Sequence, residues 1–452
     1  MDARPDIEMH SLMLVRHGHI VAEGWWHPYT ADRVHLLYSL SKSFTSTAAA
    51  FAAAEGLLDL DDTILKHFPE FESDIIDPNS RAMRIRHVAA MASGHERETR
   101  AEAFERDPKE PVRGFLLIPP DQAPGTVFAY NQPCTYTLGS IVQRNSGMPL
   151  TRYLRDRLFD PLGIGEVGWS TVAGREQGYT GLHARTEDIA KLGQLYLQQG
   201  EWQGRQLISR EWVAEATSKH VETANQQQNP DWRQGYGFQF WMSRHGYRGD
   251  GAYGQFCVIL PEHDMVVAST ASTRDMQAML AAMWTHLLPA LDRPNADASA
   301  QDEVAARLSA LALPAYQAEA EPPDWGAWSL APFAVSYADS DAPIEPSLTS
   351  ISVQNSGSGV QVTLSERDNA LTFEIGTRGW ITSTPIDSFG KSIPVASAGG
   401  WSDPKTLRVE VFFLETPHRI DIECSLDERR ACLSWRLPPL NNFKLAELHC
   451  PR

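Results

Sequence analysis

The sequence "LLYSLSKSFTSTAAA", residues 36–50, places a serine and a lysine where an apolar helix begins. Apolar residues from Phe44 onward recur at helical spacing, and Gly56 ends the run, which predicts a helix. Ser39 and Lys42 stand at positions i and i+3, so they would share one face of its first turn. The two residues are therefore either a reactive pair or the polar start of an ordinary helix.

The Ser-x-x-Lys spacing suits nucleophilic catalysis at a helix start. The backbone N–H of a first-turn serine lacks a helical partner and can bind a developing oxyanion with help from the helix dipole. A desolvated lysine one turn on can take the proton of the hydroxyl. The alternative is that Ser39 caps the helix and Lys42 is solvated. The spacing also occurs at Ser388–Lys391 and Ser402–Lys405, where strands and turns are expected, so we interpret those copies as accidental.

A tyrosine further along the chain adds to the candidate chemistry. The stretch "GTVFAYNQPCTYTLGSIV" places Tyr130 in a loop directly before a predicted helix. A tyrosine near a lysine can share its proton and act as a general acid or base. The alternative is a buried aromatic ring whose hydroxyl is satisfied elsewhere.

Patterns around these motifs predict a sheet assembled from distant parts of the chain. Near the N-terminus, "SLMLVR" and "HIVAEGWW" flank a turn at His17 and Gly18, which predicts a hairpin. Much later, "GYGFQFWM", "GAYGQFCVIL" and "DMVVASTA" predict successive strands. Between them, "TEDIAKLGQLYLQQG" predicts a helix that Thr186 caps and Gly200 ends. Strands at both ends and helices in the middle together predict one antiparallel sheet.

The C-terminal part of the chain has a different pattern. Residues 293–325 are rich in Ala, Pro, Asp and Glu and predict a linker with one short helix near Leu308. Residues 326–452 alternate apolar and polar side chains at period two, which predicts an antiparallel barrel or sandwich. We therefore expect a domain over 1–292, the linker over 293–325 and a second domain over 326–452.

Composition excludes several classes of partner. The chain has 452 residues, 42% hydrophobic and 21% charged, as expected for a globular protein of two or three domains. A formal net charge of -17 disfavours nucleic acid and anionic lipid, which both require a basic surface. No stretch approaches the roughly 20 apolar residues of a membrane span. The first residues show no signal-peptide pattern, so we predict a cytoplasmic protein, with a trimmed leader as the open alternative.

The cysteines and histidines point to neither disulfides nor metal. The five cysteines are few, odd in number and scattered, which favours reduced thiols, although Cys424 and Cys432 would face each other across a hairpin. The sequence has no GxSxG, Walker, HExxH or CxxC motif. None of the fifteen histidines stands in metal-ligand spacing, so we expect no metal and no cofactor.

The chain resembles the serine hydrolases of the class C β-lactamase, penicillin-binding protein and family VIII esterase superfamily. The resemblance covers roughly residues 9–285 and rests, in order, on "LYSLSKSFTSTAAAFAAAEGLLDLDDTI", "IRHVAAMASGH", "PGTVFAYNQPCTYTLGSIVQRNSGMPLTRYLRDRLFDPLGI", "GLHARTEDIAKLGQLYLQQGEWQGRQLISREWV" and "GYGFQFWMSRHGYRGDGAYGQFCVILPEHDMVV". It implies an α+β, β-lactamase/transpeptidase-like fold: an antiparallel sheet flanked by helices, plus an all-helical subdomain. The C-terminal strands loosely resemble the all-β domains appended to some members, which predicts a role in packing or in shaping the mouth of the cleft.

The resemblance assigns roles to the first two motifs. It implies that Ser39 is the acylated nucleophile, Lys42 its partner and Tyr130 the general acid/base. The family often has Asn or Ser two residues after the tyrosine, and here that position is Gln132. This side chain is polar and able to bind substrate, but its reach differs.

The third motif departs further from the family pattern. It is normally Lys-Thr-Gly or His-x-Gly on the strand beside the cleft, and it falls on Gly249, Asp250 and Gly251. The resemblance then implies that Ala252 donates the second oxyanion N–H, opposite that of Ser39. The expected cation is missing and Asp250 adds an anion. Arg248 and His245 are nearby and could compensate, although strand alternation would point Arg248 away from the face of residue 249. The predicted substrate-binding residues are Gln132, Arg248, Gly249, Asp250 and Gly251.

We predict a serine hydrolase that cleaves a small carboxylic ester, or an amide, through an acyl-enzyme on Ser39. The missing cation ranks a β-lactamase or D-amino-acid peptidase second. The departures at Gln132 and Gly249 leave a third hypothesis open: a catalytically silent binding or scaffold protein. The expected partner is a small-molecule substrate, with no nucleic acid and no membrane, and a homo-oligomer stays open.

Overall fold

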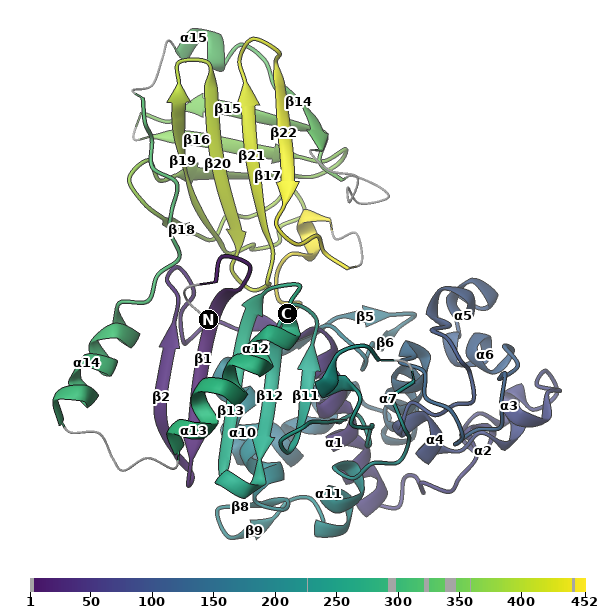
Figure 1. The fold of residues 1–452 in the computed structure, drawn as a ribbon. Helices are drawn as coiled ribbons and strands as arrows, with labels where there is room; N and C mark the ends of the chain where they lie inside the picture. The colour runs from purple at the N-terminus through teal and green to yellow at the C-terminus, as the bar shows by residue number, and fades with distance from the viewer. Residues whose placement is uncertain are drawn as a thin grey trace.

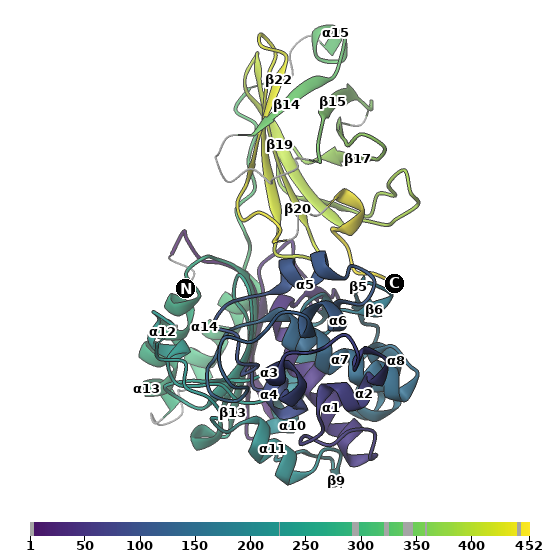
Figure 2. The same cartoon turned by 90° about the vertical axis from the view of Figure 1, so that its right-hand side faces the viewer.

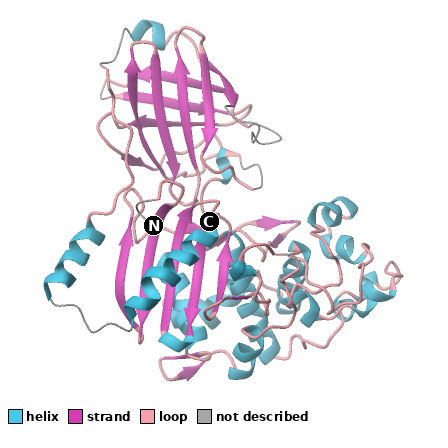
Figure 3. Ribbon diagram, in the orientation of Figure 1, coloured by secondary structure: helices cyan, strands magenta, loops and turns pink. Residues whose placement is uncertain are grey.

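The computed structural model describes residues 4–225, 227–291, 298–320, 325–337, 347–357, 359–440 and 444–452. A larger part, formed by the earlier residues, combines a sheet with helices, and a strand-rich barrel from the C-terminal residues stands on one end of it (Figures 1 and 3). Both chain ends lie near the junction of the two parts (Figures 1 and 2).

The larger part is built on one antiparallel sheet. Its elements are β1 (Glu8–Arg16), β2 (His19–Trp25), β10 (Trp241–Met242), β11 (Tyr247–Gly251), β12 (Gln255–Leu260), β13 (Met265–Ser272), α10 (Thr186–Leu197), α12 (Met276–Ala282) and α13 (Leu288–Leu291). The strand order is β10-β11-β12-β13-β1-β2, so the N-terminal hairpin pairs with the late strand β13. Helix α10 packs on one face, and α12 and α13 lie over the other (Figures 1 and 2). The predicted sheet from distant segments is confirmed.

Helices from the middle of the chain form the rest of the larger part. They are α1 (Ser41–Ala54), α2 (Ile64–His67), α3 (Pro78–Ala82), α4 (Ile85–Ala89), α5 (Arg100–Arg106), α6 (Pro111–Leu116), α7 (Gln132–Ser146), α8 (Leu150–Leu154), α9 (Asp160–Leu162) and α11 (Arg210–Ala216). Short strands join them: β3 (His35–Leu36), β4 (Gly168–Trp169), β5 (Thr171–Val172), β6 (Arg175–Glu176), β7 (Leu182–Ala184), β8 (Glu201–Trp202) and β9 (Arg205–Gln206). The central helix α1 packs on α7 and is buried from Ser41 to Ala52. It ends at Ala54, and Gly56 follows with φ +70°, as predicted.

Two local predictions differ from the structure. The stretch "GYGFQFWM" forms a strand only at Trp241–Met242, because Gln239 takes φ +64° and its side-chain amide donates to the carbonyl of Ala89 at 2.7 Å. That contact ties the segment to α4 as a loop. Thr186 is the first helical residue rather than the cap, and its hydroxyl lies 2.6 Å from the Ser11 hydroxyl.

The C-terminal barrel confirms the predicted all-β region. Its elements are α15 (Trp325–Trp328), β14 (Phe333–Tyr337), β15 (Ser350–Asn355), β16 (Val360–Ser365), β17 (Ala370–Ile375), β18 (Ile381–Ser383), β19 (Val395–Asp403), β20 (Thr406–Phe413), β21 (Arg419–Ser425) and β22 (Arg430–Trp435). The strand order is β17-β16-β15-β14-β22-β21-β20-β19-β18, antiparallel except for the parallel pair β14 and β22. The sheet curls until Gly376, just after β17, bridges Ala398 of β19. This contact brings the two ends of the sheet together and makes it barrel-like.

The segment between the two parts contains the predicted short helix, α14 (Ala298–Ser309). Leu308 and the following Leu311 pack against Gly24 of β2, where a Cβ atom would lie 2.7 Å from the Leu311 side chain. Residues 292–297 and 321–324, near the two ends of the predicted linker, lie outside the described residues. The predicted division into 1–292, 293–325 and 326–452 therefore stays a prediction.

The cysteines and helix lengths add two observations. Each of the five cysteines is free. Cys424 pairs with Ala431 and Cys432 with Glu423 on adjacent strands, so the two thiols point to opposite faces, one buried and one exposed. Among the helices in the described ranges, none is long and apolar enough to cross a membrane.

Candidate active site

Ser39 lies in a tight turn that leads directly into α1. The 3₁₀ turn Tyr38–Leu40 precedes the helix, and Tyr38 takes the left-handed conformation with φ +48°. The Ser41 hydroxyl donates to the Tyr38 carbonyl at 2.6 Å and accepts from the Leu182 N–H at 3.0 Å. Ser41, to which the sequence assigned no role, therefore holds the turn that presents Ser39.

Lys42 is buried and faces Ser39. Its Nζ donates to Ser39 Oγ at 3.0 Å and to the Tyr179 carbonyl at 2.7 Å, and the residue is 1% exposed. Burial lowers the pKa of Lys42 to about 7, although the Asp250 and Glu98 carboxylates act in the opposite direction. A large fraction of this amine is then neutral near pH 7, so its lone pair can accept the Ser39 proton.

Tyr130 lies close to both Lys42 and Ser39. Lys42 Nζ is 4.8 Å from the centre of its ring, which stacks on Trp241 at 5.4 Å with an interplanar angle of 19°. Burial and the Asp250 carboxylate raise the pKa of Tyr130, while a hydrogen bond with the Ser39 side chain opposes this rise. Tyr130 is therefore a protonated phenol at neutral pH and can act as a proton donor.

On the face of β11 that meets the start of α1, the third motif leaves little room for side chains at Gly249 and Gly251. A Cβ atom on Gly249 would collide with Ser43 Oγ and the Leu40 side chain, and one on Gly251 would collide with the Leu37 carbonyl. Strand β11 therefore approaches the 3₁₀ turn and α1 more closely than any residue with a side chain would allow. A lysine or histidine at residue 249 would therefore have to displace the Ser43 and Leu40 side chains.

Arg248 and Asp250 form a buried pair on the other face of β11. Arg248 Nε donates to Asp250 Oδ2 at 3.0 Å, and its guanidinium lies 4.3 Å from the centre of the Trp232 ring. Burial raises the pKa of Asp250, and Arg248 opposes that rise. Arg248 is fully buried, and neither side chain lines the pocket beside Ser39. Their positions therefore lend no support to the predicted roles in binding substrate.

A small pocket of about 210 Å³ opens beside Ser39. Its lining residues are Tyr38, Ser39, Glu98, Arg100, Gln132, Tyr179, Thr180 and Leu440. The Glu98 carboxylate accepts from the backbone N–H of Arg100 at 2.8 Å and from that of Gln132 at 3.3 Å. Gln132 thus borders the pocket, as its predicted role requires. Sequence reasoning missed Glu98, Arg100, Tyr179 and Leu440, which come from loops, from the start of α5 and from the segment after the last barrel strand.

Ala252 lies in the turn that follows β11. The turn packs close to the nucleophile, because the Tyr253 ring lies 5.6 Å from the Tyr38 ring. The Gln255 side chain donates to the Ala252 carbonyl at 2.9 Å and fixes that peptide. The other two Ser-x-x-Lys copies lie in barrel turns and at the end of β19, where no helix begins.

The beta-lactamase family profile matches residues 2–292, which is well over half of the chain. The chain belongs to the beta-lactamase family. It is 23% identical over 303 residues to the 6-aminohexanoate-dimer hydrolase of Paenarthrobacter ureafaciens, covering 60% of this chain and 76% of that protein. It is 21% identical over 286 residues to a putative D-alanyl-D-alanine carboxypeptidase of Salmonella agona, covering 47% of this chain and 66%, just under two thirds, of that protein.

A solved structure shows the same fold for this beta-lactamase family member. The putative 6-aminohexanoate-dimer hydrolase from Bacillus anthracis superposes with a TM-score of 0.53 at 22% identity, covering 63% of this chain and 81% of that chain. The α+β, β-lactamase-like fold expected from the sequence is thereby confirmed. The expected resemblance to this superfamily is confirmed by the family match over residues 2–292.

Proposed function

We propose that this beta-lactamase family protein hydrolyses a small carboxylic ester through an acyl-enzyme on Ser39. The observation that carries the proposal is the buried Lys42 amine, 3.0 Å from Ser39 Oγ and with its pKa lowered to about 7. Such an amine is neutral often enough to accept a proton from the attacking hydroxyl.

The proton path follows from the pKa directions of the two partners. Neutral Lys42 takes the Ser39 proton as Oγ attacks the acyl carbon and the carbonyl oxygen becomes an oxyanion. Tyr130, a protonated phenol, then donates to the leaving alkoxide, and Lys42 returns a proton to the phenolate. Water releases the acid by the reverse roles. The N–H groups of Ser39 and Ala252 would stabilise the oxyanion in both steps.

An ester is favoured over a β-lactam because of strand β11. In the superfamily that the chain resembles, the third-motif cation helps to hold a substrate carboxylate. Here Gly249 occupies that position without space for a side chain, and Arg248 points into a buried ion pair. A substrate without a carboxylate therefore fits the β11 side of the pocket better.

The second candidate is a β-lactamase or D-amino-acid peptidase, either of which cleaves an amide bond. Arg100 lines the pocket from the helical side and supplies a cation that is able to meet a substrate carboxylate. The similar proteins named 6-aminohexanoate-dimer hydrolase and putative D-alanyl-D-alanine carboxypeptidase point the same way. The third candidate, a silent binding protein, rests on the departures at Gln132 and Gly249.

Intact-mass labelling with a fluorophosphonate, together with turnover of p-nitrophenyl esters, tests the proposal. We expect one adduct on wild type and none on Ser39→Ala, and ester turnover that falls to background in the same variant. Ser388→Ala, in a barrel copy of the motif, is the matched control and should react like wild type. Equal labelling of wild type and Ser39→Ala would refute the mechanism.

A substrate panel separates the candidates. Rapid, full turnover of nitrocefin would favour a β-lactamase, and release of an amine from D-alanyl peptides would favour the peptidase. Stoichiometric binding of a ligand without acylation of Ser39 by any probe would favour the silent protein.

A further inference from the structure

Two tyrosines flank the candidate oxyanion hole, and both have strained backbones. Tyr38 directly precedes Ser39, and Tyr253 directly follows Ala252. Their φ angles are +48° and +70°, in the left-handed region that bulky side chains rarely occupy. Strain of this kind persists only where the surrounding structure holds it. The contacts of these two side chains should therefore show what keeps the oxyanion donors in place.

Both tyrosine hydroxyls bond to the C-terminal barrel. Tyr38 Oη lies 2.6 Å from His418 Nε2, and Tyr253 Oη donates to the Pro438 carbonyl at 2.8 Å. The Tyr38 and Tyr253 rings meet edge to face, and each lies 5.8 Å from the His418 ring at nearly a right angle. The barrel thus contacts the residue beside each candidate donor.

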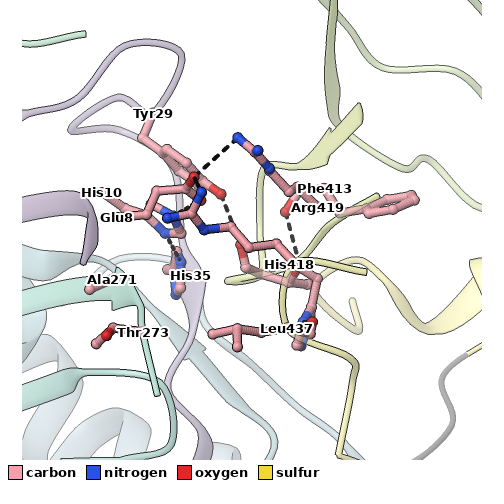
Figure 4. A network of polar contacts seen from close by, with 12 residues as sticks. Glu8, His10, Tyr29, His35, Ala271, Thr273, Phe413, His418, Arg419 and Leu437 are labelled. Atoms are coloured by element: carbon pink, nitrogen blue, oxygen red, sulfur yellow. Dashed lines mark hydrogen bonds and ion pairs between the residues drawn. The ribbon is translucent and has the colours of Figure 1, made fainter. Parts of the chain in front are cut away.

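The geometry fixes the direction of the His418 hydrogen bonds. His418 Nδ1 lies 2.8 Å from the Leu437 carbonyl, which can only accept, so Nδ1 carries the proton (Figure 4). Burial lowers the pKa of His418 to about 3, so the ring is neutral near pH 7 and Nε2 keeps a lone pair. Burial also raises the pKa of Tyr38, whose O–H therefore donates to Nε2.

Further hydrogen bonds and an ion pair join the barrel to the larger part. The Leu36 N–H donates to the Glu415 carbonyl at 2.8 Å, and the Tyr29 hydroxyl donates to the Thr416 carbonyl at 3.2 Å. The Arg419 guanidinium reaches the buried Glu8 carboxylate at 3.2 Å across the same junction (Figure 4). The loop that carries His418 is therefore held to the larger part on several sides.

We propose that His418 and Pro438 of the barrel are positioning residues for the oxyanion hole. By anchoring Tyr38 and Tyr253, they hold two strained backbones and aim the N–H groups of Ser39 and Ala252 at the acyl oxygen. Donors that are fixed before reaction stabilise the transition state without a reorganisation cost. This inference rests on the proposed function, and it makes the barrel part of the catalytic apparatus rather than an appendage.

Three Tyr-to-Phe variants test the inference. Tyr38→Phe and Tyr253→Phe each remove one hydroxyl that bonds to the barrel, and Tyr29→Phe removes a third such hydroxyl that has no oxyanion donor beside it. We expect similar losses of thermal stability in all three. Only the first two should lower kcat, by about tenfold with little change in KM, because small misplacements of catalytic groups are costly in rate. Inhibition by a boronic acid, which mimics the tetrahedral intermediate, should weaken by a similar factor.

Replacement of the histidine adds a rescue experiment. His418→Gln keeps an oxygen acceptor for the Tyr38 hydroxyl, whereas His418→Leu does not. We expect the leucine variant to lose kcat about as Tyr38→Phe does and the glutamine variant to recover most of it. A purely structural role would instead lower the stability of both without separating their kcat values.

The outcomes also separate this inference from the proposed function. Wild type without any Ser39-dependent turnover or labelling would overturn the proposed function and this inference with it. Normal wild-type turnover with unchanged kcat in Tyr38→Phe and Tyr253→Phe would overturn this inference alone. An equal loss of kcat in Tyr29→Phe would do the same, because the effect would then be general to the junction.

Discussion

Lys42 and Arg248 are buried cationic side chains on opposite sides of the candidate site, and their surroundings differ. Arg248, on β11, has the Asp250 carboxylate at 3.0 Å and the Trp232 ring beneath its guanidinium. Lys42, on α1, forms no ion pair with any carboxylate in the described part of the chain. Its hydrogen-bond partners are the Ser39 hydroxyl and a backbone carbonyl.

The difference shows which cation is available for chemistry. A guanidinium does not lose its proton in a protein, so a buried arginine requires a counter-charge. An amine without one can become neutral, and burial accordingly lowers the pKa of Lys42 to about 7. Arg248 is thus held in an ion pair with Asp250, and Lys42 is left to exchange a proton with Ser39.

Lys42→Arg should have the largest effect. The guanidinium keeps the positive charge but cannot act as a base, so kcat for an ester should fall about 10³-fold, within the usual range for loss of a general base. Steady-state kinetics on a p-nitrophenyl ester measure this change. Lys391→Arg, in a barrel copy of the motif, is the matched control and should keep wild-type kcat. An active Lys42→Arg enzyme would remove the lysine from the role of base.

Asp250→Asn should have the next largest effect, on stability. It leaves the buried Arg248 guanidinium without its counter-charge, and such losses destabilise proteins by about 3 kcal/mol or more. Urea denaturation followed by fluorescence measures the change. Asp427→Asn breaks the exposed pair with Lys405, in which both side chains are 62% exposed, and should leave the urea midpoint nearly unchanged. Equal effects in the two variants would mean that the buried pair is not structural.

The sequence predicted those helices and strands that bury only one face, because their apolar residues then recur at a regular spacing. Amphipathic spacing located α1, and alternation located most barrel strands, because each has one face in a core. Strand β19 departs from the expected alternation because it is buried from Val395 to Trp401 on both faces. Its alternation is therefore absent: Ala396 belongs to the core of the larger part, and Ala398, which bridges Gly376 within the barrel, is buried as well.

The candidate site was predictable only in part. The i, i+3 spacing anticipated the 3.0 Å contact between Lys42 and Ser39, although Ser39 lies in the 3₁₀ turn before α1 and not in the helix itself. The pocket residues Arg100 and Leu440 come from segments whose approach depends on the whole tertiary structure. Likewise, no local pattern in the sequence indicates that Gly249 packs against Ser43. From the sequence alone, the missing cation therefore suggested a lost substrate contact, whereas the structure shows a tightly packed position.

Gly249→Ala should have a smaller effect than the ion-pair variant. The added methyl group collides with Ser43 Oγ and Leu40, and overpacking of this kind costs about 2 kcal/mol. Thermal melting measures the loss, and Gly165→Ala, whose Cβ meets nothing within 4 Å, is the control. Gly249→Lys restores the cation of the family motif, yet it should destabilise the fold rather than create β-lactamase activity. A stable Gly249→Lys variant that hydrolyses nitrocefin would contradict this explanation.

The smallest expected effect is the change of kcat/KM with pH in the wild-type enzyme. Protonation of Lys42 removes the base, so kcat/KM should be constant above about pH 7 and fall tenfold for each unit below it. The nearby buried rings of His183 and His418 do not titrate there, because burial lowers the pKa of each to about 3. Asp250 raises the pKa of Lys42, so Asp250→Asn, assayed where it stays folded, should move the inflection to lower pH. If the inflection stays at the same pH in this variant, it belongs to a group other than Lys42. The difference in surroundings between Lys42 and Arg248 would then not explain which of them acts in catalysis.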